Sequence, residues 1–188
     1  MKLIVLGDTN VGKTSLIQSY IMGFVPNKYC STVGIDFLYK NLTINNHNID
    51  LHIWDTTGQE RFMSIVRPYY KGSHAVMLIF DLNNLVSFNH IETWIREIYN
   101  NIEESTYMLY LIGNKNDCEI FVSKDMIQTL LDKYPNIKYM ETCAKSNTNI
   151  NLAFDTIVTD CITHNMYQIK NNNIILKKDK TTNNNCCY

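Results

Sequence analysis

The sequence has no hydrophobic run long enough to cross a lipid bilayer. The run at residues 75–80 is six residues long and none exceeds it, whereas a transmembrane helix needs about 20 apolar residues. The apolar start at residues 3–6 ends at Gly7, short of the roughly 7–15 residues of a signal-peptide core. Contact with a membrane is therefore expected to come from a tail or from an added lipid.

Net charge and paired cysteines are scarce as well. Lys and Arg number 17 against 18 Asp and Glu, a net charge of −1, which argues against a protein built mainly to bind nucleic acid. The six cysteines include no CxxC pair, so neither a zinc site nor a disulfide scaffold is indicated, and a reducing cytosol is favoured. Hydrophobic residues make up 45% of the 188, enough for the core of one domain.

Short apolar runs alternate with helical patterns along the chain. Residues 3–6, 75–80 and 107–112 are continuous apolar runs, typical of parallel strands buried on both faces. Residues 35–44 and 49–53 indicate two further strands, and the polar cluster between them predicts an antiparallel hairpin. The alternation predicts an open α/β sheet with helices on both faces and a ligand at the carboxyl ends of the strands.

Helical periodicity fills the segments between these strands. Gly23 is a plausible C-terminal cap for the first helix and Ser123 an N-terminal cap for a later one. Glu92 and Arg96 are spaced as an i,i+4 pair. The apolar stripes are Leu16, Ile17, Tyr20 and Ile21; Phe88, Ile91, Ile95 and Ile98; Ile127, Leu130 and Leu131; and Ile150, Phe154, Ile157, Val158 and Cys161.

The composition changes near residue 164. Residues 165–188 hold seven Asn, four Lys, one Asp and the apolar triplet 174–176, with a charge of +3 from four Lys minus one Asp. Such a segment cannot bury enough apolar surface to fold alone. We therefore expect one domain over residues 1–164 and a flexible tail over 165–188.

The strongest local signal is the segment GDTNVGKT at residues 7–14. It fits G-x-x-x-x-G-K-[ST] and stands between an apolar strand and an amphipathic helix, the context that this phosphate-binding motif requires. Glycines let backbone N–H groups approach phosphate oxygens, and the helix N-terminus adds a positive dipole. Lys13 can reach the outer phosphates, and the Thr14 hydroxyl can ligate Mg²⁺.

Two further segments follow strands at the same edge of the expected sheet. DTTGQ, at residues 55–59, offers a carboxylate for Mg²⁺, a glycine N–H for a γ-phosphate and a glutamine that can orient water. GNKND, at residues 113–117, ends in a carboxylate that can accept hydrogen bonds from N1–H and the 2-amino group of guanine, so Asp117 would select guanine. Asn114 and the stem of Lys115 would brace that pocket.

Five ordered features carry a family resemblance: GDTNVGKT, Thr32, WDTTGQE, GNKND and ETCAK. In this order and spacing they resemble Ras-like small GTPases. The segments STVGIDF, RFMSI, PYYKGS and LIFDLN, with the terminal Cys-Cys-X, are similar to those of the Rab family. The resemblance covers about residues 2–164 and the last three. It implies an α/β fold of the P-loop NTPase type, a small G domain with a six-stranded, mostly parallel sheet, one antiparallel hairpin strand and helices on both faces.

The resemblance implies roles around the phosphates of GTP. Thr32 matches a threonine that ligates Mg²⁺ and contacts the γ-phosphate. Asp55 matches a water-bridged Mg²⁺ ligand, Gly58 a γ-phosphate sensor and Gln59 the catalytic residue that positions the attacking water. The expected Mg²⁺ residues are Thr14, Thr32 and Asp55. The expected phosphate contacts are Thr9, Asn10, Val11, Gly12, Lys13, Thr14, Ser15, Thr32 and Gly58.

Other matches concern the base and the protein surface. The expected guanine contacts are Asn114, Lys115, Asp117, Cys143, Ala144 and Lys145, with Cys143 where the family usually has Ser. Phe37, Trp54 and Tyr69 match an aromatic trio that Rab proteins show to effectors, although plain core packing would also explain aromatics on strands.

Two departures from the family pattern bear on activity. Thr57 stands where the family usually has Ala. If its side chain turns into the site, it would slow GTP hydrolysis; if its side chain turns to solvent, the rate of hydrolysis would not change. Val25 stands where an aromatic ring usually covers the guanine edge, and Phe24 next to it is a candidate substitute. The alternatives stay open on the sequence alone.

The chain ends in Cys186, Cys187 and Tyr188. A C-a-a-X box would need Cys at position 185, which is Asn. Paired terminal cysteines on a mildly basic tail resemble the doubly geranylgeranylated end of Rab proteins, and two long lipid chains give stable anchoring where one is marginal. Two idle thiols are the alternative.

Together with these motifs, the resemblance to Rab proteins implies a GTP- and Mg²⁺-dependent switch that hydrolyses GTP to GDP and phosphate slowly, and acts in vesicle trafficking. The implied partners are effectors, an exchange factor, a GTPase activator and the prenylation machinery. The protein is expected to be a monomer in the cytosol and, through its lipid anchor, on the cytoplasmic face of a membrane. The alternative is a guanine-nucleotide-binding module that recruits effectors with little or no hydrolysis. An ATP-using P-loop kinase is disfavoured by Asn114, Lys115 and Asp117.

Overall fold

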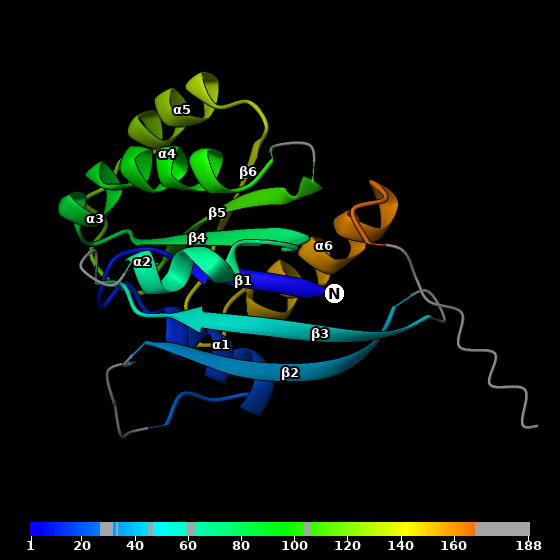
Figure 1. The fold of residues 1–188 in the computed structure, drawn as a ribbon. Coiled ribbons are helices and arrows are strands. Elements are labelled where there is room, and N and C mark those ends of the chain that lie inside the picture. The colour runs from blue at the N-terminus through cyan, green and yellow to red at the C-terminus, as the bar shows by residue number, and fades with distance from the viewer. Residues whose placement is uncertain (27–31, 33, 45–46, 60–62, 104–105, 168–188) are drawn as a thin grey trace, which may run out of the picture.

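The computed structural model of the protein describes residues 1–26, 32, 34–44, 47–59, 63–103 and 106–167. Within them, six strands form one sheet in the spatial order β2-β3-β1-β4-β5-β6, drawn as arrows in Figure 1. Neighbouring strands are parallel except for β2, which is antiparallel to β3. This confirms the predicted sheet. The strands are β1 (Lys2–Leu6), β2 (Ile35–Ile44), β3 (His47–Thr56), β4 (Ala75–Asp81), β5 (Met108–Asn114) and β6 (Ile137–Glu141).

Helices cover both faces of the sheet, as predicted. α1 and α6 pack on one face and the remaining helices on the other, and Figure 1 shows the two groups separated by the strands. The helices are α1 (Lys13–Met22), α2 (Met63–Val66), the 3-10 turn η2 (Arg67–Tyr69), α3 (Leu85–Asn89), α4 (Ile91–Asn101), α5 (Lys124–Lys133) and α6 (Ile150–Thr163).

The central strands are buried on both sides. In β1, Leu3 and Val5 join the cluster with α1 and α6, whereas Ile4 and Leu6 join the cluster on the α4 face. Every residue of β4 is buried. Because successive strand residues point to opposite faces, a strand between two helical layers must be apolar at every position. This accounts for the continuous apolar runs in the sequence.

The expected helix caps form. Gly23 takes φ 81° and its N–H donates to the Ser19 carbonyl, a left-handed conformation that glycine adopts at little cost. The Ser123 hydroxyl accepts a hydrogen bond from the Met126 N–H at the start of α5. The C-terminal end of α1 and the N-terminal end of α5 are therefore set by the residue types that the sequence offers there.

Three local predictions were wrong. The stripe from Phe88 to Ile98 is divided between α3 and α4, which meet at His90. Arg96 donates to the backbone oxygen of Glu92, whose carboxylate instead binds Lys133 of α5 at 2.8 Å. Strand β3 begins at His47, two residues before the alternating pattern, because the Ile44–His47 and Thr43–Asn48 pairs extend the ladder. Residues 45–46 lie outside the described residues.

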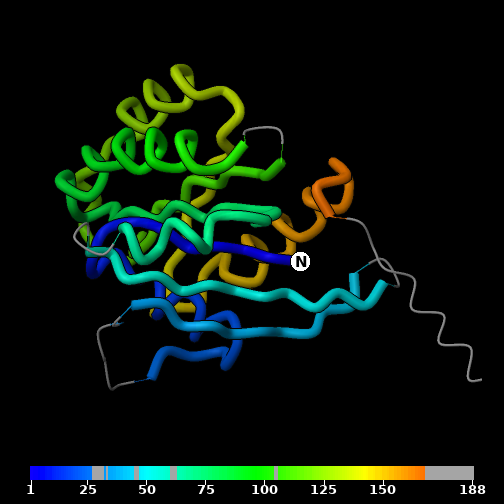
Figure 2. The backbone as a smooth tube through the Cα atoms, in the orientation of Figure 1, coloured from blue at the N-terminus to red at the C-terminus, as the bar shows by residue number. Residues whose placement is uncertain are grey.

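The two ends of the sheet are distinct. The parallel strands end on the left of Figure 1, whereas the N-terminus and the end of α6 lie on the right, and the tube in Figure 2 traces the same arrangement. Asn165 and Tyr167 still hydrogen-bond α6, through the carbonyls of Ile162 and Cys161. The rest of the expected tail, residues 168–188, lies outside the described residues, so the predicted division at residue 164 stays a prediction.

Candidate functional site

The segment of residues 7–14 joins the end of β1 to the start of α1. Gly7 has φ 133°, and a Cβ there would stand 2.1 Å from the carbonyl oxygen of Ile79. Gly12 has φ 97° and is the N-cap of α1. Side chains at these positions would be strained or would clash, so the loop keeps the close backbone turn that a phosphate-binding segment needs.

Lys13 is buried at the first position of α1, 6% exposed. Its Nζ donates to the carbonyls of Gly7 at 2.9 Å and Asp8 at 2.7 Å, so the ammonium group lies across the mouth of the loop. Burial lowers the pKa of Lys13 to about 8, against the opposing effects of the Asp55 and Asp8 charges. A cation held in this way is placed to bind an anionic group in the loop.

Two hydroxyls and a carboxylate converge beside Lys13. Thr14 Oγ1 donates to Asp55 Oδ2 at 2.6 Å and lies 2.7 Å from Thr32 Oγ1. Thr32 Oγ1 in turn donates to the same Asp55 oxygen at 3.4 Å. These three residues come from α1, from position 32 and from β3, so the structure brings together all of the predicted Mg²⁺ residues.

The donor set fits a divalent cation. Asp55 is 1% exposed, and burial, as the largest cause, raises the pKa of its carboxyl above the usual value. Its second oxygen, Oδ1, is buried and has no hydrogen-bond partner among the described residues. A buried unpaired carboxylate oxygen is costly, and Mg²⁺ prefers oxygen ligands such as carboxylates and water. The polar cluster is thus suited to holding Mg²⁺ near Asp55.

Thr57, Gly58 and Gln59 follow β3 and face the phosphate loop. A Cβ at Gly58 would stand 2.2 Å from the backbone carbon of Asp8, so the two backbones are in contact and glycine is required. Thr57 is 4% exposed, and its N–H donates to the Gly34 carbonyl at 2.8 Å. The alternative in which Thr57 turns to solvent is therefore wrong. These residues and the phosphate loop line one cleft, formed by Thr9, Asn10, Gly12, Lys13, Thr14, Ser15, Thr32, Thr56, Thr57, Gly58 and Gln59.

Val11, the remaining predicted phosphate contact, has its side chain in the core. Its carbonyl accepts a hydrogen bond at 2.9 Å from Nδ2 of Asn114, at the end of β5. The Oδ1 atom of Asn114 accepts from the Thr142 hydroxyl and from the Ala144 N–H, both at 3.3 Å. One buried amide side chain therefore ties the phosphate loop to the loop that follows β6.

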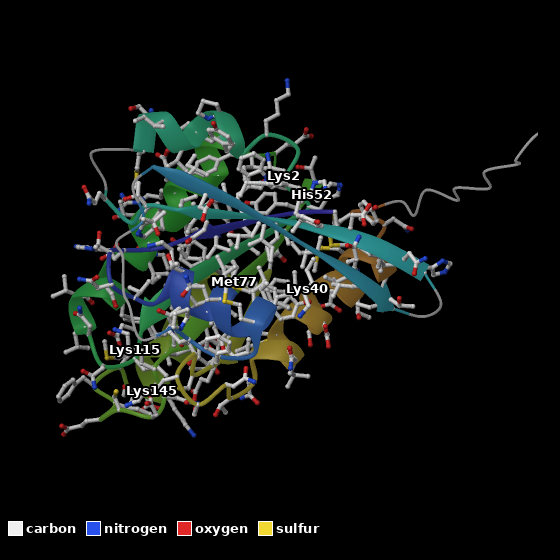
Figure 3. All side chains as sticks on the ribbon, turned by 90° about the horizontal axis from the view of Figure 1, so that it is seen from below. Lys2, Lys40, His52, Met77, Lys115 and Lys145 are labelled. Carbon is white, nitrogen blue, oxygen red and sulfur yellow. The ribbon has the colours of Figure 1, made fainter. Side chains whose placement is uncertain are left out.

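The predicted guanine residues line a second pocket next to the phosphate cleft. Lys115 bridges the Asn10 carbonyl at 2.8 Å and the Asp81 carboxylate at 2.6 Å, which fixes its stem along one wall. Figure 3 shows Lys115 and Lys145 at the same edge of the molecule. The lining residues are Gly12, Ser15, Val25, Pro26, Asn114, Lys115, Asp117, Cys118, Cys143, Ala144 and Lys145.

Asp117 is exposed at this pocket. A hydrogen bond from the Cys143 thiol, as the largest cause, lowers the pKa of the Asp117 carboxyl. Cys143 is 1% exposed and its sulfur accepts from the Ser146 N–H at 3.3 Å. The thiol thus takes part in holding the carboxylate in its ionised form, the form that accepts hydrogen bonds.

Val25, and not Phe24, lines this pocket within the described part of the chain. Phe24 is 61% exposed, so it does not replace the missing ring. Sequence reasoning also missed Cys118, to which it assigned no role. Its thiol lies 3.8 Å from the carboxylate of Asp117, and only its position next to that residue could have indicated a place at the pocket.

Asp8 is a second residue that the motif analysis overlooked. Its carboxylate accepts a hydrogen bond from Trp94 Nε1 at 2.8 Å and lies 2.6 Å from His90 Nδ1. Both partners lie at α4, more than 80 residues away in sequence. No local pattern around Asp8 could have shown these contacts, which fasten the phosphate loop to the opposite helical layer.

The aromatic trio forms a continuous row on the surface of β2, β3 and η2. The ring centroids of Phe37 and Trp54 are 5.0 Å apart, and those of Trp54 and Tyr69 are 4.8 Å apart. Phe37 is 47% exposed. The row is thus partly open to solvent, which favours a surface role over plain core packing.

Comparisons with known proteins agree with this architecture. A model of the Ras family matches residues 2–163. The chain is 37% identical over 174 residues to Ras-related protein Rab-8B of Pongo abelii, covering 92% of this chain and 83% of the relative. It is 40% identical over 159 residues to Ras-related protein Rab-1 of Theileria parva, covering 83% and 71%, and 36% identical over 162 residues to GTP-binding protein ypt2 of Schizosaccharomyces pombe, covering 85% and 80%.

The chain therefore belongs to the Ras family of small GTPases, as a member of its Rab group. It is a GTPase of the Rab type, a guanine-nucleotide-binding switch of vesicle trafficking that hydrolyses GTP. Family membership favours this function over a module that binds nucleotide without hydrolysis. No helix within the described residues has the length and apolar character needed to span a membrane.

Proposed function

We propose that this chain runs its GTPase cycle with Mg²⁺ held at Thr14, Thr32 and Asp55. The observation that carries the proposal is the convergence of these three side chains on one point, next to a buried Asp55 oxygen with no hydrogen-bond partner in the described part of the chain. Bound there, Mg²⁺ neutralises the charge that develops on the phosphates. Asp55 would hold the ion through a water, as the family resemblance implies, and its Oδ1, which has no partner among the described residues, can accept a hydrogen bond from that water.

The phosphates are bound by the loop and by Lys13. Residues 9, 10 and 12–15, which include the start of α1, line the cleft, and the Lys13 ammonium lies across it. Such groups stabilise negative charge in a site that has lost part of its water. Gln59 orients the attacking water, and Gly58 brings its N–H to the γ-phosphate, a position that no larger residue could take beside Asp8.

Guanine is selected by Asp117. Its carboxylate, kept ionised with help from the Cys143 thiol, accepts hydrogen bonds from N1–H and the 2-amino group. Adenine offers no such pair of donors, so ATP is rejected. Ala144 and Lys145 form the far wall of the pocket and the stem of Lys115 the near wall. Val25 covers the guanine edge less than a ring would, so we expect weaker retention of nucleotide.

The switch consists of the segments that carry Thr32 and Gly58. Contacts of both with the γ-phosphate order the two loops, and hydrolysis releases them. The motifs of this chain include no arginine finger. An external activator is therefore required for fast turnover, with an acceleration of about 10³–10⁵. The row of Phe37, Trp54 and Tyr69 serves as the surface that effectors read.

The tail supplies the membrane anchor through prenylation of Cys186 and Cys187. Two lipid chains hold a protein on a membrane stably, whereas a tail charge of +3 is worth only about 1 kcal/mol per Lys near an anionic surface. The protein then works as a monomer that alternates between the cytosol and the cytoplasmic face of a membrane.

The Mg²⁺ assignment is tested by the release of a fluorescent GDP analogue with and without a chelator. Chelation should speed release from the wild type. Asp55→Asn should weaken Mg²⁺ binding by about 10–100-fold, so release from this variant should be fast at ordinary Mg²⁺ concentrations. Asp50→Asn, at the exposed far end of the same strand, is the matched control and should behave as the wild type. A normal Mg²⁺ dependence in Asp55→Asn would refute the assignment.

The anchor is tested by fractionating cells that express tagged protein. Replacing both Cys186 and Cys187 by Ser should move the protein from membranes to the cytosol. A control with Thr181→Ser and Thr182→Ser alters the same tail but keeps both thiols, and should stay on membranes. Persistent membrane association of the double cysteine variant would refute lipid anchoring.

A further inference from the structure

An apolar groove lies at the end of the sheet opposite the nucleotide pockets. It is bounded by the last turn of α4, the amino ends of β5 and β6, and the segment after α6. Its volume is about 400 Å³, within the range of about 300–1,000 Å³ in which proteins hold small ligands. Its lining includes Tyr99, Tyr107, Met108, Leu109, Ile137 and Met166.

The groove favours an apolar occupant. Its open apolar surface comes from the half-buried side chains of Tyr99, Met108 and Met166, which lie beside the almost fully buried Tyr107, Leu109 and Ile137. The lysine on its rim, Lys138, is neutralised by the Asp160 carboxylate at 2.5 Å. Covering these half-buried side chains removes apolar surface from water, which is favourable in proportion to the area covered.

The tail begins directly beside this groove. Met166, the penultimate described residue, is itself part of the lining. The next residue is held in place: the Tyr167 N–H donates to the Cys161 carbonyl at 3.1 Å, and the Tyr167 ring packs edge-on against His74 with centroids 5.2 Å apart. The tail therefore starts from a fixed point beside the groove.

The tail carries a matching segment a short distance further on. Residues 171–173 are three consecutive Asn, which favour turns, and they are followed at once by Ile174, Ile175 and Leu176. From Tyr167 to Ile174 is seven residues, a reach of up to about 25 Å. We propose that the triplet 174–176 folds back and docks in this groove.

Docking within one chain has a small entropic cost. The connection is short, and a short flexible connection gives an effective concentration in the millimolar range, so a weak apolar contact is enough to populate the docked form. A second copy of the chain would have to reach that concentration in solution. The tail of the same molecule is accordingly the occupant that the position and length of the connection favour.

Docking changes how far the folded domain can stand from the chain end. Free from Tyr167, the 19 residues to Cys186 span up to about 65 Å, whereas from a docked Leu176 the 10 residues to Cys186 span about 35 Å. Docking of the triplet in the groove therefore reduces the maximum distance between the folded domain and Cys186 by about half. The inference holds for the unmodified chain and does not depend on lipidation.

Amide hydrogen exchange of the full-length, GDP-bound chain tests the proposal. In a free tail, the amides of residues 173–177 exchange at the rate of an unfolded peptide. Docking should slow them at least about tenfold. Tyr99→Arg places a charge in the groove wall while suiting the last turn of a helix, and should restore the free rate. Tyr99→Phe keeps the ring and should preserve the protection.

The remaining measurements separate the occupants. Ile175→Asn leaves the folded domain untouched and should also abolish protection, which covers the case that Tyr99→Arg fails to fold. Protection should be the same at two protein concentrations tenfold apart. The proposal is overturned by an unprotected wild-type tail, by protection that survives both variants, by protection that fades on dilution, which indicates a second copy, or by protection only in lipidated protein, which indicates a lipid chain.

Discussion

The two halves of the nucleotide site place their charges in opposite environments. In the phosphate half, residues 7–15, 32 and 55–59, Lys13 and Asp55 are almost fully buried. In the base half, residues 114–118 and 143–145, the carboxylate of Asp117 is exposed. Burial lowers the pKa of Lys13 and raises the pKa of Asp55, which in both cases favours the neutral form. The pKa of Asp117 is instead lowered by a hydrogen bond from the Cys143 thiol, which favours the charged form. The phosphate half thus depends on several coupled groups, and the base half on one solvated acceptor.

The largest effect is expected when that acceptor is changed. Asp117→Asn replaces an acceptor by an amide that presents N–H to the guanine edge, and should weaken GTP on the order of 10³-fold while favouring xanthine nucleotides. Fully built polar sites reject the wrong partner by about 10⁴–10⁵, and the exposure of Asp117 lowers this figure. Competition binding measures it, with Asp132→Asn on α5 as the matched control. Equal GTP affinity in variant and wild type would contradict the proposal that Asp117 recognises guanine.

A change confined to the phosphate half should separate binding from hydrolysis. Gln59→Leu leaves the phosphate loop and Lys13 in place but cannot orient water, so hydrolysis should slow by about 10²-fold with GTP affinity preserved. Single-turnover kinetics measure this, and Gln128→Leu on α5 is the control. An unchanged rate would mean that Gln59 has no catalytic role.

The buried lysine predicts a pH dependence that belongs to the phosphate half alone. With a pKa of about 8, Lys13 loses its charge in the free protein as pH rises through 8, whereas bound phosphates favour the ammonium form. GDP affinity should therefore be greatest below pH 8 and fall above it, by up to about tenfold per pH unit. Guanosine, which lacks phosphates, should not follow this curve. If the affinities for GDP and guanosine changed with pH in the same way, the pH dependence could not come from Lys13 binding the phosphates.

The smallest effect concerns Thr57. Its side chain is buried and lines the phosphate cleft next to Gly58, so we predict that Thr57→Ala relieves crowding and speeds intrinsic hydrolysis by up to about tenfold, below the 10²-fold that a 1 Å misplacement costs. GTP affinity should change little. Single-turnover assays at saturating Mg²⁺ compare the variant with Thr43→Ala on β2. A rate equal to or below that of the wild type would show that Thr57 is not a brake.

The sequence predicted what depends on neighbours along the chain. Gly23 and Ser123 cap their helices because capping uses residues within one turn. The parallel strands covered on both faces follow from apolar runs that only such a sheet can bury. The phosphate and base motifs were found because each is a continuous segment at the end of a strand.

What the sequence could not predict depends on distant partners. The carboxylate of Glu92 binds Lys133, 41 residues away, whereas Arg96 reaches only the backbone oxygen of Glu92. The break at His90 was hidden because the apolar stripe continues in phase across it, while His90 itself contacts Asp8 of the phosphate loop. The orientation of Thr57 likewise follows from the approach of Gly34, a long-range contact that no local pattern encodes.

The side chain of Asn114 links the phosphate half and the base half of the site through hydrogen bonds. Its amide holds the Val11 carbonyl with one end and the Thr142 hydroxyl and Ala144 N–H with the other, and its Nδ2 is only 2.3 Å from where a Cβ of Gly12 would be. Moving either the phosphate loop or the loop after β6 outward would strain the hydrogen bonds that this side chain makes to the other loop. We therefore expect a displacement of either loop to disturb the phosphate half and the base half of the site together.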